Sequence, residues 1–321
     1  MTLPRPTLVV PGDDPPMIAD SHHLERLAEL VELQVFRDRP TSLAEQITRG
    51  TDAELMINSR SNTAWTAAAL AALPRLRMIS TCSIGVDAVD LIAASKQGIV
   101  VSNVPGRTAP VVAEHTLALI LATARRLAFL TAELKAGHWN SMDNIYLRGK
   151  TLGVVGTGAI GGETLKLARA IGMNVQAWTY HPTVARAAEL DVAFVELEEL
   201  LATSDVVSLH VKLTEQSRHL ISSQELAAMK PGSLLINTAR GPVVDTTALV
   251  AALQDGHLAG AAVDVFDQEP ITADHPLLQC PQVVLTPHSA DQNPTGRDLL
   301  NSGAVENVLA FLNGQPQNVV S

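Results

Sequence analysis

One stretch, TLGVVGTGAIG at residues 151–161, constrains the fold of this chain more than any other. Its apolar first half leads into Gly156, Gly158 and Gly161, which have the spacing GxGxxG, and residues 163–171 have helical character. The first glycine allows a tight turn from strand to helix, the second lets the backbone approach a pyrophosphate, and the third lets helix and strand pack closely. The N–H groups that begin the helix then face the phosphates. The stretch therefore predicts a dinucleotide-binding unit, and the alternative is a glycine-rich turn in another α/β protein.

The composition supports a large apolar core. The chain has 321 residues, enough for two domains of ordinary size, and 46% of them are hydrophobic. Only 3% are aromatic, so the core must consist mostly of Ala, Val, Leu and Ile, which suits buried parallel strands. The net charge is −10 and no long basic run occurs, which disfavours nucleic acid and anionic membranes as partners.

The cysteines and the N-terminus indicate a cytoplasmic protein. Cys82 and Cys280 lie far apart without metal-ligand spacing, so we expect reduced thiols and no metal site. The N-terminal residues contain no apolar core of a signal peptide. The most apolar stretch, residues 111–124, contains Glu114 and His115 and is too short to span a bilayer.

Short apolar runs alternate with helical segments along the chain. We expect strands at residues 7–10, 35–36, 55–57, 78–80, 99–102, 152–155, 175–178, 206–210, 234–237, 260–265 and 283–286. We expect helices at residues 23–33, 42–49, 65–73, 86–94, 109–130, 163–171, 223–229, 246–255 and 294–312. This alternation is typical of parallel sheets, so the predicted fold class is α/β.

The sequence predicts two domains, one inserted into the other. Pro105 and Gly106 break the first run of strands and helices, and a helix too hydrophobic for a surface follows them. We expect a Rossmann-type doubly wound parallel sheet at residues 103–289, which binds the dinucleotide. Residues 1–102 and 290–321 are expected to form a smaller, flavodoxin-like α/β domain that binds the substrate. The active site is expected in the cleft between the domains, at the carboxyl ends of the strands.

Three polar residues follow apolar strands of the second domain. Arg240 ends LLINTARG, Glu269 follows AAVDVFDQ, and His288 follows VVLTP. His288 can give or take a proton near neutral pH, and Glu269 could hydrogen-bond its other ring nitrogen. Arg240 can grip a carboxylate with two parallel N–H bonds and polarise a neighbouring carbonyl. Each residue alone is more often a loop or surface residue. Together, and with a nicotinamide cofactor, they predict hydride transfer to a 2-keto acid.

At these residues the chain resembles the D-isomer-specific 2-hydroxyacid dehydrogenase family, which includes phosphoglycerate dehydrogenases and glyoxylate or hydroxypyruvate reductases. The matching segments are CSIGVDAVDL at 82–91, VSNVPGRTAPVVAEHTLALILA at 101–122, GKTLGVVGTGAIG at 149–161, SDVVSLHVKLTEQSRHLIS at 204–222, INTARG at 236–241, AAVDVFDQEP at 261–270 and LTPHSA at 285–290. Several independent motifs in the same order make this resemblance specific, and it covers nearly the whole chain.

The resemblance implies a role for each matching residue. Arg240 would orient the substrate, His288 would be the acid/base and Glu269 its partner. Backbone N–H groups of Ser83, Ile84 and Gly85 would hold the substrate carboxylate. The residues implied to bind the cofactor NAD(P) are Val104, Thr108, Gly156, Gly158, Ala159, Ile160, Gly161, Thr179, Tyr180, His181, His210, Lys212, Thr238, Ala239 and Asp264. Among these, Asp264 would contact the nicotinamide amide. Members of the family are usually dimers joined through the cofactor domains, so a homodimer is expected.

The chain departs from the family pattern after the second strand of the dinucleotide unit. NAD-using members have an acidic residue there, which accepts from the ribose hydroxyls, whereas this chain has Thr179. Thr179 and Tyr180 could hydrogen-bond a 2′-phosphate, and His181 or Arg186 could add positive charge. We therefore expect NADP preference or dual use, and the alternative is ribose binding through neutral hydroxyls. Lys212 could be a second phosphate contact or a solvated lysine.

The substrate is the least determined part of the prediction. Arg60 resembles an arginine that helps to bind acidic substrates in phosphoglycerate dehydrogenases, and Arg107 lies in a segment expected near the cleft. Asp291 stands close to His288, where the family often has glycine. Reduction of glyoxylate or hydroxypyruvate and oxidation of phosphoglycerate stay open. A nicotinamide-sensing corepressor of the C-terminal-binding-protein type, which shares the fold and the three polar residues, is the alternative to an enzyme.

Overall fold

The chain folds into two compact units. A computed structural model describes residues 4–60 and 63–321. Unit 1 comprises Met1–Thr108 and Gln292–Ser321, and unit 2 comprises Ala109–Asp291. The chain therefore leaves unit 1 once and returns to it once.

The connection at residues 103–108 belongs to unit 1, so the units divide after Thr108 instead of at the predicted 102/103. The Asn103 N–H donates to the Asn318 carbonyl at 3.2 Å, close to the end of the chain. Arg107 forms an ion pair with Glu306. Arg107, expected near the cleft, therefore has a carboxylate partner within unit 1.

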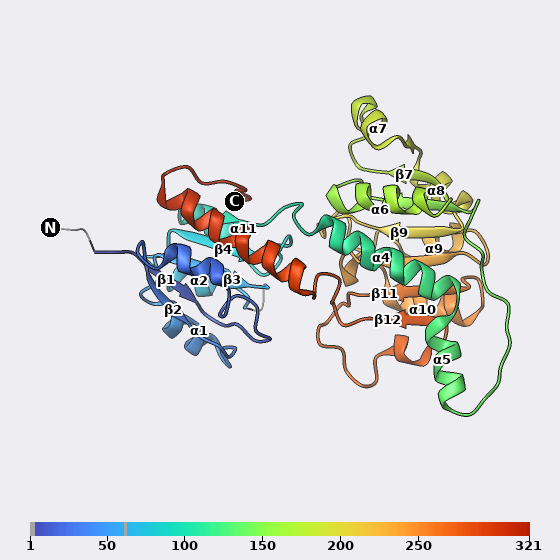
Figure 1. The fold of residues 1–321 in the computed structure, drawn as a ribbon, viewed down its shortest axis with the longest axis horizontal. Coiled ribbons are helices and arrows are strands. Elements are labelled where there is room, and N and C mark those ends of the chain that lie inside the picture. The colour runs from blue at the N-terminus through green and yellow to red at the C-terminus, as the bar shows by residue number, and fades with distance from the viewer. Residues whose placement is uncertain (1–3, 61–62) are drawn as a thin grey trace. The chain divides into compact units, whose positions relative to one another are not determined.

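Unit 1 is built on a five-stranded parallel sheet with the strand order β2-β1-β3-β4-β5. Its strands are β1 (Thr7–Val10), β2 (Glu32–Val35), β3 (Leu55–Ser59), β4 (Met78–Cys82) and β5 (Val100–Ser102). Its helices are η1 (His22–Leu27), α1 (Leu43–Gly50), α2 (Ala67–Ala71), α3 (Leu91–Lys96) and α11 (Pro294–Leu312). The order is that of flavodoxin-like folds. The central strands β1, β3 and β4 are fully buried, and α11 packs against β4 (Figure 1).

Unit 2 is built on a seven-stranded parallel sheet with the order β12-β11-β10-β9-β6-β7-β8. Its strands are β6 (Thr151–Val155), β7 (Asn174–Trp178), β8 (Ala193–Phe194), β9 (Val206–Leu209), β10 (Leu234–Asn237), β11 (Gly260–Val263) and β12 (Val283–Leu285). Its helices are α4 (Ala109–Ala124), α5 (Leu127–Lys135), α6 (Ala159–Ala170), α7 (Val184–Leu190), α8 (Leu197–Thr203), α9 (Ser223–Ala228), η2 (Gly241–Val243), α10 (Thr246–Gln254) and η3 (Pro276–Gln279). The strand order reverses between β6 and β9, where doubly wound sheets bind dinucleotides. The predicted α/β fold class is confirmed.

The predicted helix at residues 23–33 is wrong. The segment forms the short 3-10 helix η1, capped by the Ser21 hydroxyl, which accepts from the His23 N–H, and then the edge strand β2. Every residue of β2 pairs with β1. The pairing with β1 therefore stabilises the strand more than the weak helical periodicity of this segment would stabilise a helix.

The predicted helix at residues 109–130 is two helices, α4 and α5. Arg126 between them has φ 52°, a left-handed conformation that a continuous right-handed helix cannot contain. Similarly, the helix predicted at 86–94 begins only at Leu91, because the Asp90 carboxylate caps it by accepting from the Ala93 N–H. Within residues 4–60 and 63–321, no helix has the length and apolar character that a membrane crossing requires.

The elements α7, β8 and α8 were not predicted from the sequence. Helix α7 buries only Leu190, so its sequence lacks the apolar stripe that identifies an amphipathic helix. Strand β8 has two residues, which is too short for a recognisable pattern. These elements extend the sheet of unit 2 beyond β7.

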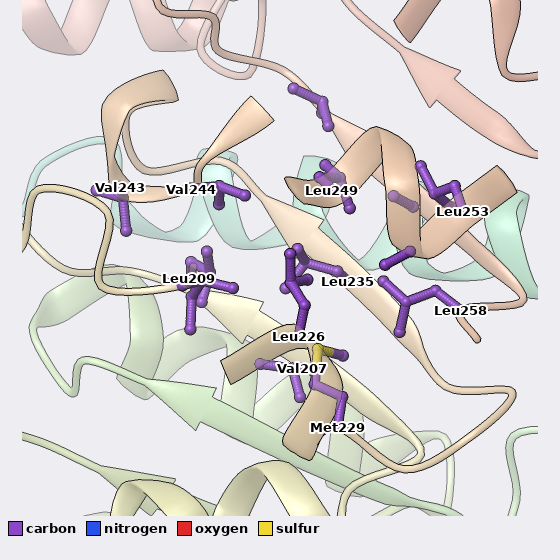
Figure 2. Packing of buried hydrophobic residues seen from close by; sticks show 14 of the residues in the cluster. Val207, Leu209, Leu226, Met229, Leu235, Val243, Val244, Leu249, Leu253 and Leu258 are labelled. Atoms are coloured by element: carbon purple, nitrogen blue, oxygen red, sulfur yellow. The ribbon is translucent and has the colours of Figure 1, made fainter. Parts of the chain in front are cut away.

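One apolar cluster fills unit 2 between its sheet and the helices α9 and α10 (Figure 2). Leu235 of β10 is 1% exposed and lies in this cluster with Val207 of β9, Leu226 of α9 and Leu249 of α10. The cluster therefore fixes the strands whose carboxyl ends carry the candidate site residues.

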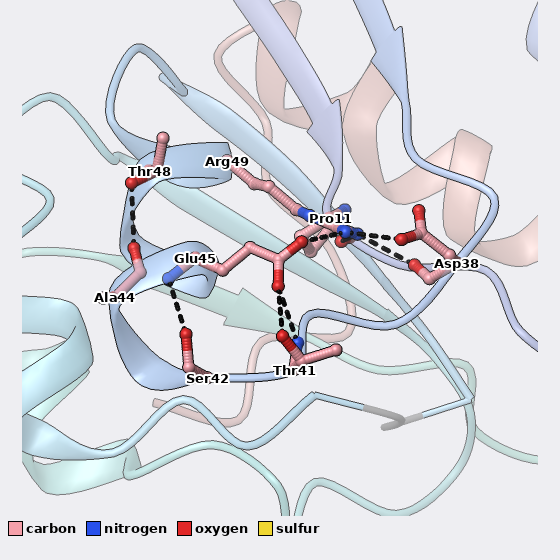
Figure 3. Close-up of polar contacts among 8 residues, drawn as sticks. All are labelled: Pro11, Asp38, Thr41, Ser42, Ala44, Glu45, Thr48 and Arg49. Carbon is pink, nitrogen blue, oxygen red and sulfur yellow. Dashed lines mark hydrogen bonds and ion pairs between the residues drawn. The ribbon is translucent and has the colours of Figure 1, made fainter.

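A buried arginine ties three segments of unit 1 together (Figure 3). The Arg49 guanidinium at the end of α1 donates to the carbonyls of Pro11 and Asp38, both at 2.9 Å, and contacts the Glu45 carboxylate at 2.5 Å. The Thr41 N–H and hydroxyl, with Arg49, lower the pKa of the Glu45 carboxyl to about 2. Pro11 follows β1, so this cluster holds the backbone at the carboxyl edge of the sheet.

We expect Leu235→Ala to lower the free energy of unfolding by about 2–5 kcal/mol, because it removes buried atoms and leaves a cavity in a packed cluster. The matched control is Leu278→Ala, whose side chain is 43% exposed, with an expected change within about 0.5 kcal/mol. Urea denaturation followed by circular dichroism measures both. Equal losses in the two variants would contradict the expectation.

Candidate active site

The glycine-rich turn between β6 and α6 combines close packing with one open position. Gly156 has φ +99°, and a Cβ there would lie 2.8 Å from the carbonyl of His210. A Cβ on Gly161 would lie 2.1 Å from the Gly156 oxygen. At Gly158, in contrast, a Cβ would meet no atom within 4 Å. The turn therefore requires glycine at two positions and leaves room for a ligand at the third.

The first turn of α6 lies directly beside that open position. Gly158 is the N-cap and supplies no side-chain hydrogen bond, and Ala159 and Ile160 follow it as the first helical residues. N–H groups without such a cap at a helix N-terminus attract anions. These residues fit the pyrophosphate of NAD(P), and their contact with it stays a prediction.

The end of β7 lies next to this turn, because β7 pairs with β6. Thr179 and Tyr180, which follow β7, are half-buried, and His181 is exposed. Burial raises the pKa of the Tyr180 hydroxyl, which donates to the Gln216 carbonyl at 3.4 Å. No carboxylate from this segment faces the position where an adenosine ribose would lie in a Rossmann unit.

Arg186 of α7 reaches back to the glycine-rich turn. Its Nη2 donates to the Thr157 carbonyl at 2.7 Å, and its Nη1 contacts the Glu189 carboxylate at 2.7 Å. A guanidinium is therefore fixed beside the glycine-rich turn.

The predicted cofactor residues after β9 and β10 differ in exposure. The His210 imidazole contacts the Ser208 hydroxyl at 2.9 Å, and burial lowers its pKa to about 3. His210 is thus a neutral hydrogen-bonding group and no acid/base near neutral pH. Lys212 is exposed, whereas Thr238 and Ala239 are buried after β10.

His288 and Glu269 form a hydrogen-bonded pair. The distance from His288 Nδ1 to Glu269 Oε2 is 2.7 Å, and the Phe266 N–H donates to the other carboxylate oxygen at 2.9 Å. Burial would raise the pKa of the Glu269 carboxyl, but the hydrogen bond and charge of His288, the Phe266 N–H and the charge of Arg240 outweigh it and lower the pKa. The pair can hold the imidazole in one orientation and stabilise its protonated form.

The loop that carries Arg240 passes in close backbone contact with the loop that carries Glu269. A Cβ on Gly241 would lie 2.0 Å from the Phe266 carbonyl carbon, so only glycine lets the two backbones pass. The Asn237 side chain donates to the Arg240 carbonyl at 3.0 Å and fixes the turn after β10. The structure thus positions the Arg240 backbone against the segment that leads to Glu269.

The Asp264 carboxylate, 1% exposed, organises the loop of His288. It accepts from the Thr286 hydroxyl at 2.5 Å, the Ser289 N–H at 2.9 Å and the Ala290 N–H at 3.2 Å, and lies 3.5 Å from His115 Nε2. Burial would raise the pKa of Asp264, but hydrogen bonds from His115, Thr286 and Ser289 outweigh it and lower the pKa. The carboxylate therefore accepts hydrogen bonds from residues on both sides of His288 and holds this loop in place.

The backbone of His288 is held in an unusual conformation. Its φ is 49°, in the left-handed region, and its N–H donates to the Asp264 carbonyl at 2.7 Å. Such strained residues often occur at functional sites.

Sequence reasoning missed His115 and Thr286. The available signal was the polar pair Glu114-His115 within an otherwise apolar helix. The contact of Asp264 with a nicotinamide amide stays a prediction, because its oxygens accept from the loop of His288.

In unit 1, the predicted substrate residues lie at one sheet edge. Ser59 of β3 pairs with Cys82 of β4, so Arg60 and Ser83 are the next residues on neighbouring strands. Arg60 has φ 47°, also left-handed. The carboxyl edge of a parallel sheet is where such folds bind ligands.

The carbonyls of the segment 83–85 are all engaged within unit 1. Ser83 accepts from the Val104 N–H at 2.9 Å, Ile84 from the Asn103 side chain at 2.7 Å, and Gly85 from the Ser83 hydroxyl at 2.6 Å. These bonds fix the orientation of the peptide groups whose N–H donors were predicted to hold a carboxylate.

Val104 and Thr108 were predicted to line the nicotinamide pocket. Val104 is buried in the core of unit 1, where it packs on Gly303 of α11, so its role stays a prediction. The Thr108 hydroxyl is fully buried and finds no hydrogen-bond partner within the described residues. An orphaned buried hydroxyl of this kind fits a site completed by a ligand.

Comparison with known proteins points to one family. The family model "D-isomer specific 2-hydroxyacid dehydrogenase, NAD binding domain" matches residues 117–290. The glyoxylate reductase of Korarchaeum cryptofilum is 37% identical over 309 residues, which cover 93% of this chain and 92% of the relative.

Solved structures show the same fold over the whole chain. An NADPH-dependent glyoxylate/hydroxypyruvate reductase from Sinorhizobium meliloti, in complex with NADP and malonate, superposes with a TM-score of 0.86 at 30% identity, covering 99% of this chain and 97% of that one. A D-lactate dehydrogenase from Aquifex aeolicus, complexed with NAD and lactic acid, gives a TM-score of 0.82 at 31% identity, with 96% of each chain covered.

We expect Asp264→Asn to lower the free energy of unfolding by about 1–3 kcal/mol at pH 7, because an amide group would face donors that need an acceptor. The folded pKa of Asp264 lies below its ordinary value near 3.8, so the carboxylate stabilises the fold above that value. This stabilisation is lost as the pH falls through the folded pKa, and the difference from the wild type then narrows. Denaturation at several pH values measures it.

The matched control is Asp267→Asn, an exposed carboxylate that accepts from the Thr246 hydroxyl. Equal destabilisation by both substitutions would show that the Asp264 network adds nothing to stability.

Proposed function

We propose that this chain, which belongs to the D-isomer specific 2-hydroxyacid dehydrogenase family, interconverts a small 2-keto acid and its D-2-hydroxy acid with NAD(P), and that glyoxylate or hydroxypyruvate is the keto acid. The observation that carries the proposal is the His288–Glu269 pair at 2.7 Å, in the same unit as the glycine-rich turn. Glyoxylate is favoured because the glyoxylate reductase relative aligns over nearly its whole length.

His288 is the acid/base of the proposed reaction. Its Nδ1 faces Glu269, and Nε2 is the nitrogen proposed to donate a proton to the keto oxygen in the direction of reduction. The Glu269 carboxylate stabilises the imidazolium before the transfer and orients the ring. The nicotinamide, when bound, supplies the hydride that adds to the carbonyl carbon. In the reverse direction, Nε2 takes the proton from the hydroxyl.

Arg240 and the segment 83–85 bind the substrate. The Arg240 guanidinium stabilises the negative charge that develops on the keto oxygen and orients the neighbouring carboxylate. The N–H groups of Ser83, Ile84 and Gly85 bind that carboxylate, with their peptide groups fixed by the bonds to their carbonyls. Arg60, at the same sheet edge, adds attraction for an anionic substrate.

The proposed enzyme prefers NADP. Thr179 stands where a carboxylate would repel the 2′-phosphate, and Arg186 is held at the glycine-rich turn beside it. Tyr180 and His181 add hydrogen-bond donors on the same segment. The two compared structures contain different cofactors, NADP in one and NAD in the other, so the preference rests on these residues.

We expect the purified protein to reduce glyoxylate or hydroxypyruvate in a panel of 2-keto acids, with a higher kcat/KM for NADPH than for NADH. His288→Gln should lower kcat by about 10²–10⁴-fold, because it removes the proton donor. Absorbance at the nicotinamide band measures all rates. The control His257→Gln changes an imidazole that contacts the Met229 carbonyl at 3.0 Å and has no proposed role in the reaction, so it should leave the rates unchanged.

The outcomes separate the parts of the proposal. Turnover with a large NADH advantage would contradict the cofactor preference alone. No turnover of any keto acid, with nicotinamide binding retained, would contradict the enzyme and favour a sensor of the corepressor type.

The homodimer is proposed to form through α5 and the segment that follows it. Helix α5 buries no residue of its own. Leu134 is 56% exposed, Trp139 90% and Tyr146 70%. Large apolar side chains gathered on one exposed segment mark an association surface. A second copy of the chain is the partner that the family implies.

We expect Leu134→Glu combined with Trp139→Glu to convert a dimer into a monomer, because two carboxylates would be desolvated in the interface. Light scattering after size exclusion measures the mass. The control is Ile92→Glu in unit 1, also strongly exposed, which should leave the dimer intact. A wild-type monomer, or a variant that stays dimeric, would contradict the proposed interface.

A further inference from the structure

Three ligand-type side chains converge on the surface of unit 1, and none of them was assigned to the candidate active site. His22 and His23 begin η1, and Asp298 lies in the first half of α11. One ring nitrogen of His22, one of His23 and a carboxylate oxygen of Asp298 all lie within 4.8 Å of one another. In the part of the chain that the structure describes, no other group of three such residues meets this condition. We propose that His22, His23 and Asp298 bind a divalent transition-metal ion, with Zn²⁺ as the reference ion.

The separations of the donor atoms suit one shared ion. His23 Nε2 lies 2.9 Å and His22 Nδ1 4.0 Å from the same oxygen, Asp298 Oδ1. Tetrahedral zinc with bonds of about 2.0–2.1 Å requires donor atoms roughly 3.3 Å apart. The two distances bracket that value, so rotations of side chains are sufficient to complete the site.

The exposure of the three side chains fits a site with one ligand held in place and with access for an ion from solvent. The His23 side chain is only 12% exposed, whereas those of His22 and Asp298 are 71% and 55% exposed. His23 is also fixed by its N–H bond to the Ser21 hydroxyl. One ligand is therefore largely in place, and the other two can close on an ion from solvent.

The second histidine argues against a simple hydrogen bond. A bond from His23 to Asp298 explains one imidazole, yet the His22 ring lies 4.0 Å from the His23 ring and directs its Nδ1 to the same carboxylate. Two imidazoles and a carboxylate that converge in this way form a donor set for a metal ion.

The donor set selects the class of ion. Two imidazole nitrogens and one carboxylate oxygen favour Zn²⁺, Co²⁺, Ni²⁺ or Cu²⁺ over Mg²⁺ and Ca²⁺, which prefer oxygen ligands alone. Water completes the coordination, as at zinc sites with three protein ligands. The affinity should fall on acidification, because imidazole must lose its proton to bind metal.

The ion would join η1 to α11 inside unit 1. The two elements are already linked by the ion pair of Arg26 with Glu306 at 3.8 Å. Helix α11 starts just after the chain re-enters unit 1 at Gln292, so the metal would fasten the first turns of that helix. Binding to the folded form alone raises its thermal stability. The proposal is independent of the proposed catalysis.

The test uses full-length, tag-free protein stripped with a chelator and titrated with Zn²⁺ by calorimetry. We expect one ion per chain and a higher melting temperature with Zn²⁺. His23→Gln and Asp298→Asn should each weaken binding by about tenfold or more and abolish the temperature shift. Co²⁺ should give a visible spectrum with d–d bands of tetrahedral nitrogen and oxygen coordination in the wild type, and these bands should be absent in the His23 and Asp298 variants.

The matched control is His138→Gln, which removes an exposed imidazole 3.2 Å from a single carboxylate, that of Glu133. This variant should bind Zn²⁺ as the wild type does. Absence of binding to the wild type would overturn the proposal, as would unchanged binding by the His23 and Asp298 variants or an equal loss in the His138 variant. Circular dichroism verifies that every variant is folded.

Discussion

The buried Asp264 carboxylate is the contact on which the candidate active site depends. Its oxygens accept hydrogen bonds on both sides of His288, and its carbonyl accepts the His288 N–H. Because Asp264 directly follows the buried strand β11, its hydrogen bonds fix the position of the imidazole relative to the sheet. The left-handed backbone of His288 is thereby maintained, and the imidazole meets Glu269 from a fixed direction. Rigid support of this kind is what precise proton transfer requires.

The fold could be predicted because its strands are continuous apolar runs. Buried parallel strands need no alternation, so runs such as LLIN and TLVV identified β10 and β1, and residues 294–312 were recognised as the helix α11. Prediction was wrong where the energetics are not local. Strand β2 forms because β1 pairs with it, and α7 forms although it buries only Leu190. Such elements depend on neighbours that a local pattern does not contain.

The site residues also divide into those that a local sequence pattern identifies and those that it does not. Arg240, Glu269 and His288 could be found because each follows a strand, and the carboxyl ends of parallel strands meet at one edge. Their roles stay predictions, as do those of Ser83, Ile84 and Gly85. The residues that hold the loop of His288 in place could not be identified from the sequence. His115 reaches Asp264 from α4, and no spacing rule connects those two positions. The same holds for His23 and Asp298, 275 residues apart in the chain, where the sequence indicated no metal site.

The close backbone approach at Gly241 couples the conformation of the loop that carries Arg240 to that of the loop that carries Glu269. The backbone that follows Arg240 passes so close to Phe266 that no side chain fits between them. A change in length or course of either loop must therefore be matched by the other. The loops proposed to bind the substrate anion and to support proton transfer can then diverge only together. Variation in substrate preference would then come from outside these two loops, for instance from the carboxyl edge of unit 1, where Arg60 follows β3.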